Sequence, residues 1–170
     1  MLRLVLVLCI ATLSGCATKL ETVYVPAENS GWKVGYGANK PGVTLIEYIP
    51  SNESIENWSR IFTIQFLENM RNSTSATVKE LRSIMFSNCP NTKWDVLVEE
   101  TLSVTYERAT IGCKGGNEYE IARLLKGNDG IHRISYTTKE QIPETERNKW
   151  LKAFSEAYVE KGGQRVSVKP

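Results

Sequence analysis

The sequence predicts an α+β fold, with an antiparallel sheet of about five strands packed as a layered sandwich. Two helices are expected before the strand meander, and one C-terminal helix after it. β-rich segments follow one another through the middle of the chain with short turns between them, and apolar residues recur at helical spacing on either side. The composition is 41% hydrophobic and 24% charged, which is typical of an ordinary globular domain.

The first elements are expected between residues 43 and 87. Residues 43–49 are β-branched and aromatic and end at Pro50, which predicts a strand. A helix is predicted over residues 55–70, because apolar residues follow at spacings of three and four, at Ile55, Trp58, Phe62 and Phe66. A second helix is predicted over residues 76–87, before a proline that cannot continue it.

The middle of the chain predicts an antiparallel meander. Four segments have strand-like patterns, at residues 94–98, 104–113, 119–125 and 131–138. The turn at residues 127–130, Gly-Asn-Asp-Gly, is typical of a tight hairpin. A last helix opens at Pro143 and carries an apolar stripe of Trp150, Phe154 and Tyr158. This order is loosely similar to the α-β-α sandwich of PsbP-like and Mog1-like proteins, a likeness that implies a fold and no site.

The first residues have the pattern of an export signal. Arg3 supplies a positive charge, and residues 4–13 form an apolar run too short to span a bilayer lastingly. The sequence Leu13-Ser14-Gly15-Cys16 follows, which resembles the lipobox of bacterial lipoproteins. The resemblance implies that the signal peptide is removed before Cys16 and that this cysteine carries diacylglycerol and palmitate. Several acyl chains on one residue would hold the protein stably on a membrane.

These patterns predict the domain organisation and the location. Residues 1–15 are expected to be the signal peptide, 16–42 a lipidated tether, 43–162 one α+β domain and 163–170 a tail. Ala17 stands after the cysteine where an aspartate would retain a Gram-negative lipoprotein in the inner membrane. The resemblance therefore implies an outer-membrane protein that faces the periplasm, with the membrane as a partner through its N-terminal lipid.

The cysteines predict one disulfide bond. Cys9 belongs to the signal peptide and Cys16 to the lipid anchor, which leaves Cys89 and Cys113 in an exported domain. If residues 94–101 pair with 104–113 about a turn near residue 102, these two cysteines meet at the open end of the hairpin.

Charge and residue types argue against several functions. The chain has 21 basic and 19 acidic residues, so no strong field attracts nucleic acid. No metal site or cofactor is expected, because the chain has one histidine and no Cys-x-x-C motif. The basic residues Lys161, Arg165 and Lys169 near the C-terminus suit either a solvated tail or contact with a phosphate-bearing envelope surface.

Two residues are considered for catalysis. His132 is the one side chain with an ordinary pKa near neutrality, and no Gly-x-Ser-x-Gly elbow accompanies it. Glu47 shares a strand face with apolar residues, so it is exposed, paired with an arginine, or buried with a raised pKa. Neither residue has a second group to work with in the sequence, and we expect no enzyme activity.

Trp32 and Tyr36 form the candidate binding surface, because they lie in glycine-rich sequence that predicts neither a helix nor a strand. We therefore expect a non-enzymatic protein-binding or assembly module that docks on an envelope protein. One alternative is a periplasmic binder of lipid or another apolar small molecule, which requires a cavity lined by aromatic residues. A hydrolase that uses Glu47 or His132 is the other alternative.

Overall fold

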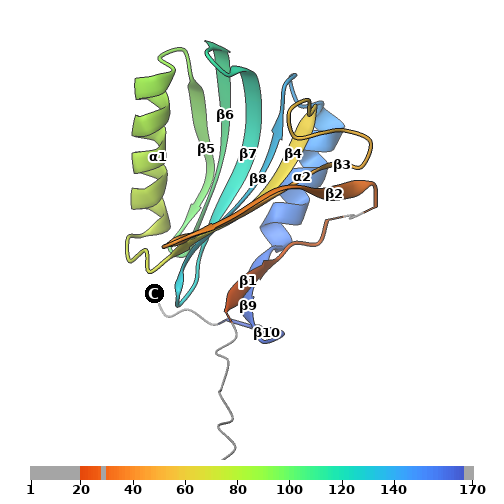
Figure 1. The fold of residues 1–170 in the computed structure, drawn as a ribbon. Coiled ribbons are helices and arrows are strands. Elements are labelled where there is room, and N and C mark those ends of the chain that lie inside the picture. Colours follow the sequence, from red (N-terminus) through yellow and green to blue (C-terminus); the bar gives the residue numbers. More distant parts are fainter. Residues whose placement is uncertain (1–19, 28–29, 167–170) are drawn as a thin grey trace, which may run out of the picture.

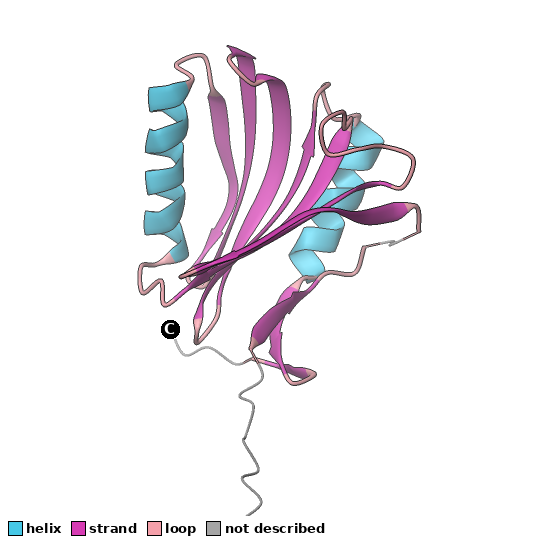
Figure 2. Cartoon of the chain, viewed as in Figure 1, coloured by secondary structure: helices cyan, strands magenta, loops and turns pink. Residues whose placement is uncertain are grey.

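The described part of the chain, residues 20–27 and 30–166, folds in the computed structural model as two antiparallel sheets and two helices (Figures 1 and 2). In chain order the elements are β1 (Glu21–Tyr24), β2 (Trp32–Lys40), β3 (Val43–Pro50), β4 (Arg60–Glu68), α1 (Thr74–Asn88), β5 (Lys93–Glu100), β6 (Ser103–Cys113), β7 (Gly116–Lys126), β8 (Gly130–Thr138), α2 (Glu144–Glu156), β9 (Tyr158–Lys161) and β10 (Gln164–Arg165).

The larger sheet has seven strands in the order β2-β3-β4-β8-β7-β6-β5. Strands β2, β3 and β4 form one meander, and α1 then connects β4 to β5 at the opposite edge of the sheet. The second meander runs back from β5, so that β8 ends beside β4 in the middle. In the smaller sheet β9 lies between β1 and β10, which brings the N-terminal strand against the C-terminal end of the chain (Figure 1).

One helix packs on each face of the larger sheet, and we name the two faces after them. On the α2 face, Ile121 and Leu125 of β7 join Trp150 and Phe154 in one apolar core. On the α1 face, the alternate residues of the same strand pack with Val78 of α1 in a second core. The α1 core also contains Trp94, Val104, Tyr106, Ala122, Leu124 and Ile131.

The predicted sheet of about five strands with three helices is wrong. The described residues contain two helices, and the segment expected to be a helix over residues 55–70 instead holds β4. Phe62 and Phe66 are four residues apart, a spacing that places side chains together on a strand as well as on a helix. Ile64 lies between them, and the register of β4 against β8 puts all three on the α2 face.

Strands also occupy the segment expected to be a tether. β1 and β2 lie within residues 16–42, and the glycines of β2 have a packing role. A Cβ on Gly35 would lie 2.9 Å from the side chain of Ile49, so glycine lets β2 pass close to β3. The last helix is shorter than expected, because the backbone becomes extended at Ala157 and β9 begins at Tyr158.

The predicted disulfide bond between Cys89 and Cys113 is confirmed, with a Cα–Cα distance of 5.7 Å. It links the C-terminal end of α1 to the end of β6. β5 and β6 pair as the expected hairpin, although Trp94 lies opposite Arg108 rather than two residues further on. Neither described helix is long and apolar enough to cross a membrane.

Candidate functional site: an aromatic cleft on the α2 face

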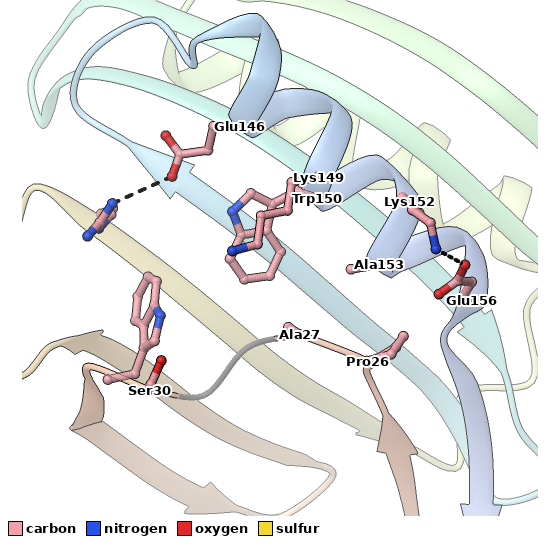
Figure 3. Close-up of a pocket in the computed structure, with 11 residues that line it drawn as sticks. Pro26, Ala27, Ser30, Glu146, Lys149, Trp150, Lys152, Ala153 and Glu156 are labelled. Atoms are coloured by element: carbon pink, nitrogen blue, oxygen red, sulfur yellow. Dashed lines mark hydrogen bonds and ion pairs between the residues drawn. The ribbon is translucent and has the colours of Figure 1, made fainter.

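Two adjoining hollows lie on the α2 face, where the chain after β1 approaches the sheet and α2. Figure 3 shows the residues that line the larger of the two. Their volumes are about 450 and 360 Å³. Both are lined by Ala27, Trp32 and Trp150, so the two hollows meet at these side chains. We call the combined space the aromatic cleft; its other ring-bearing walls are Tyr24, Tyr48 and Phe62.

Trp150 contacts other aromatic rings around the aromatic cleft. It lies on the buried stripe of α2 and is 6% exposed. Its ring stacks on Tyr136 at 4.5 Å and on Phe62 at 5.2 Å, measured between ring centroids. Trp32 meets Trp150 edge to face at 6.3 Å. These are the offset-stacked and edge-to-face arrangements that aromatic pairs prefer, so the walls of the cleft are fixed by packing.

The rim of the aromatic cleft carries charges of both signs. The Arg60 guanidinium lies 5.6 Å from the Trp32 ring centroid and 3.6 Å from the Glu146 carboxylate. Lys152 and Glu156 form an ion pair one turn apart on α2 (Figure 3). The Tyr136 hydroxyl donates to Glu146 at 2.5 Å, and the pKa of Tyr136 is raised, first by burial and then by this carboxylate. Opposite charges therefore pair with one another beside the aromatic rings.

The structure separates the two residues of the sequence-predicted binding surface. Trp32 pairs with Pro50 and lies on the α2 face in the aromatic cleft. Tyr36 pairs with Glu47 and lies on the α1 face, where it is 44% exposed. A register shift between Val34 and Tyr36 explains this, because one extra residue in a strand turns the following side chains to the opposite face.

His132 is enclosed in the domain and serves its packing. Its ring stacks on Phe66 at 4.6 Å and is 1% exposed, so no substrate reaches it. The Nε2 atom lies 3.6 Å from the carboxylate of Glu21. Burial lowers the pKa of His132, and the nearby charges of Glu21 and Asp129 oppose this effect only in part.

Glu47 lies in a polar hollow of about 280 Å³ on the α1 face, beyond the part of the sheet that α1 covers. Its side chain is half-buried, and its pKa is raised mainly by burial, with Arg133 acting in the opposite direction. Arg108, Glu118 and Glu120 line the same hollow. Glu47 is thus partly buried with a raised pKa, which is one of the three environments considered from the sequence.

The same hollow borders a group of buried charges that we call the ionic cluster: Tyr106, Arg108, Glu120 and Arg133. Glu120 accepts hydrogen bonds from Arg108 at 3.0 and 3.1 Å and from the Tyr106 hydroxyl at 3.1 Å, and Arg133 lies 2.7 Å from it. Burial alone would raise the pKa of Glu120, but the two arginines outweigh it and lower the pKa to about 2.

Sequence reasoning did not find this cluster, because Glu118 and Glu120 alternate with apolar residues as on a solvated sheet face. The signal lay on the neighbouring strands, where Arg108 is directly opposite Glu120. Cross-strand partners become visible only when the register is known. Within residues 20–27 and 30–166, no group of three or more histidine, cysteine, aspartate or glutamate side chains is placed to hold a metal ion.

The comparisons with known proteins give a family. The model of one protein family matches residues 29–166, a range that includes the seven-stranded sheet, α1 and α2. No curated protein and no solved structure matches the chain.

Proposed function

We propose that this chain, which belongs to the protein family matched over residues 29–166, is a lipid-anchored envelope protein that binds an apolar small molecule and catalyses no reaction. The observation that carries the proposal is the pair of hollows that meet at Trp32 and Trp150. The sequence offered this function as an alternative to protein docking, and the aromatic cleft now favours it.

The aromatic cleft has the size and chemistry of a small-molecule site. Each of its hollows, at about 360 and 450 Å³, falls within the range of ligand pockets, on the order of 300–1,000 Å³. Aromatic and aliphatic walls favour an apolar ligand, because burying its surface contributes about 25 cal/mol per Å². Arg60 with Glu146 and Lys152 with Glu156 are paired on the rim, which favours a ligand whose buried part is neutral.

The anchored location rests on the N-terminal sequence, which lies outside the described residues. Leu13-Ser14-Gly15-Cys16 supports acylation of Cys16, and Ala17 supports export to the outer membrane, facing the periplasm. The disulfide between Cys89 and Cys113 agrees with an oxidising compartment.

Protein docking remains a second candidate, favoured by the exposed edge strand β2. Val34 is 60% exposed and Tyr36 is 44% exposed, on opposite faces of this strand. An edge strand has unpaired backbone groups, to which the strand of a partner can add. This surface lies outside the aromatic cleft apart from Trp32, so the two functions can be tested separately.

A photo-crosslinking experiment in the native envelope distinguishes the two functions. Benzoylphenylalanine replaces Lys152, which is exposed on the rim of the aromatic cleft, or Tyr36 on β2. Irradiation of the Lys152 variant should give an adduct of small-molecule mass. Adding Trp32→Ala should reduce that adduct about tenfold, the effect expected for removing a central aromatic contact.

The control and the opposing result are both specific. Tyr36→Ala should leave the Lys152 adduct unchanged, because Tyr36 lies on the other face of the sheet. A small-molecule adduct that persists at full yield with Trp32→Ala, in protein that remains folded, would exclude the aromatic cleft as the site. A discrete protein adduct at position 36 with none at position 152 would favour docking through β2.

A further inference from the structure

The chain is fixed to the domain very close to the expected lipid anchor. Glu21 is 3% exposed, and its carboxylate accepts hydrogen bonds from the backbone N–H groups of Asn128 at 3.0 Å and Asp129 at 2.9 Å. In β1 it also pairs with Lys161 of β9. These contacts join the first described strand to the β7–β8 turn and to the C-terminal strands.

The length of the intervening chain limits the distance between this point and the membrane. Glu21 is five residue steps after Cys16, and a fully extended chain spans at most about 3.6 Å per step. The Cα atom of Glu21 therefore lies within about 18 Å of that of Cys16 in any conformation of the chain. The 27-residue tether expected from the sequence would have allowed several times this distance.

The residues around Glu21 suit a lipid surface. Leu20 is 67% exposed, although it directly precedes the buried Glu21. Lys161 has an exposed ammonium 2.8 Å from Asp129, and the Arg165 guanidinium lies 5.0 Å from the ring centroid of Tyr158. Exposed apolar residues, aromatic rings and cations together favour the interface between lipid and water.

We propose that this end of the domain, formed by Leu20, the β7–β8 turn and the β9–β10 hairpin, rests on the lipid surface. In Figure 1 it lies at the lower end of the molecule, where β1 begins beside β9 and β10. The inference depends on acylation of Cys16, which belongs to the proposed function. We call this surface the membrane-facing end.

The arrangement places the aromatic cleft near the membrane. Tyr24 ends β1 and lines the cleft, eight residues after Cys16, so its Cα atom lies within about 29 Å of the anchor. An apolar ligand that moves between the bilayer and the aromatic cleft therefore crosses a short distance. The geometry identifies the bilayer beneath the domain as the source or the destination of such a ligand.

Energy transfer to labelled lipids tests the orientation in the mature, lipidated protein. Vesicles of phosphatidylethanolamine and phosphatidylglycerol carry an acceptor on the lipid headgroups. A donor is attached at Gln164→Cys in the β9–β10 hairpin or at Asn52→Cys, an exposed position after β3. Cys89 and Cys113 are joined to each other and do not react.

The two labelled positions lie at opposite ends of the domain. β4 runs from Arg60, near the Asn52 loop, to Glu68 beside Gly130, a span of nine residues and about 27 Å. Because transfer falls steeply with distance, the Gln164 label should be quenched at least about twofold more than the Asn52 label. A matched variant with twenty glycine and serine residues inserted after Ala17 should lose this difference, because its longer linker is flexible.

The outcomes separate this inference from the proposed function. Equal quenching at both positions, in protein whose mass confirms three acyl chains, would overturn the membrane-facing end and leave the lipid anchor intact. A difference that survives the insertion would show that an interaction other than the short linker sets the orientation, and would overturn the linker argument. A purified chain without acyl mass would contradict both proposals.

Discussion

The two faces of the seven-stranded sheet differ in how their side chains pack. The α2 face carries aromatic rings with open hollows beside them, whereas the α1 face carries a closely packed polar cluster. On the α2 face, Trp32, Phe62 and Trp150 pack around hollows whose walls combine aromatic rings with charged side chains such as Glu160. On the α1 face, beyond α1, Arg108 and Arg133 close on the Glu120 carboxylate. The aromatic cleft lies over β2, β3 and β4 and the ionic cluster over β6, β7 and β8, and the two regions differ in whether their side chains need hydrogen-bonding partners.

The difference follows from the directionality of the contacts. A hollow beside aromatic rings loses some dispersion contacts but leaves no hydrogen-bonding group of the rings without a partner. A buried carboxylate with unfilled bonding positions costs far more, so the groups around Glu120 lie close to it. The aromatic face can therefore accept a ligand at little cost, whereas the ionic cluster is expected to act on stability.

The largest effect should follow from Glu120→Gln. This change keeps the shape of the side chain but leaves two buried guanidinium groups without their shared anion, and we expect the free energy of unfolding to fall by about 3–5 kcal/mol. Urea unfolding measures the loss. Glu118→Gln is the matched control, since its side chain is 28% exposed and its nearest ion pairs are 3.4 Å long; it should cost less than about 1 kcal/mol.

Glu120 also gives the wild-type protein a specific acid dependence. Its pKa is about 2 in the folded state against 4.5 ordinarily, so the folded protein binds fewer protons than the unfolded chain. The stability that this carboxylate provides is complete above about pH 4.5 and is lost as the pH falls toward 2. Glu120→Gln should flatten the stability profile in that window, and an unchanged profile would show that the cluster does not act as the structure implies.

The contrast also shows what the sequence could predict. The second meander, α1 and the disulfide were predictable, because each depends on local patterns such as the alternation in residues 131–138. In the first meander β3 was predicted as a strand over residues 43–49, but β4 was not, because Phe62 and Phe66 fit a helix and a strand equally. β2 was missed since its glycines weaken strand propensity and serve a close approach that only the packing against Ile49 reveals.

The site was predictable only in part. Trp32 was identified as a residue outside any expected core, and the structure places it in the aromatic cleft. Its partner Trp150 was assigned to the core alone, because a helical stripe does not show that an adjacent space is left open. The register shift that separates Tyr36 from Trp32 depends on pairing with β3, which no single strand contains.

A smaller effect on stability should come from titration of His132, which lies on the α2 face. Its pKa is lowered in the folded protein, so the unfolded chain takes up the proton more readily and stability should decrease as the pH falls below about 6.5. We expect the free energy of unfolding to fall between pH 7 and pH 5, as measured by urea unfolding. In His132→Gln this loss should disappear, whereas Glu120→Gln should retain it; a loss that His132→Gln retains would assign the titration to another group.

The smallest effect should follow from Tyr36→Ala, which tests whether the two faces act independently along one strand. Tyr36 is 44% exposed on the edge strand β2, so its removal should lower the free energy of unfolding by less than about 1 kcal/mol. Trp32→Ala, four residues earlier, should cost more, because the Trp32 ring contacts both Tyr136 and Trp150. Thermal melts of Tyr36→Ala, Trp32→Ala and the double variant measure the loss of stability in each protein and any coupling between the two changes. Additive losses would mean that the faces are independent, as expected for side chains on opposite sides of a sheet. A coupling above about 0.5 kcal/mol would instead show that the register shift at Val34 and Tyr36 transmits strain from the edge of the sheet to the aromatic cleft.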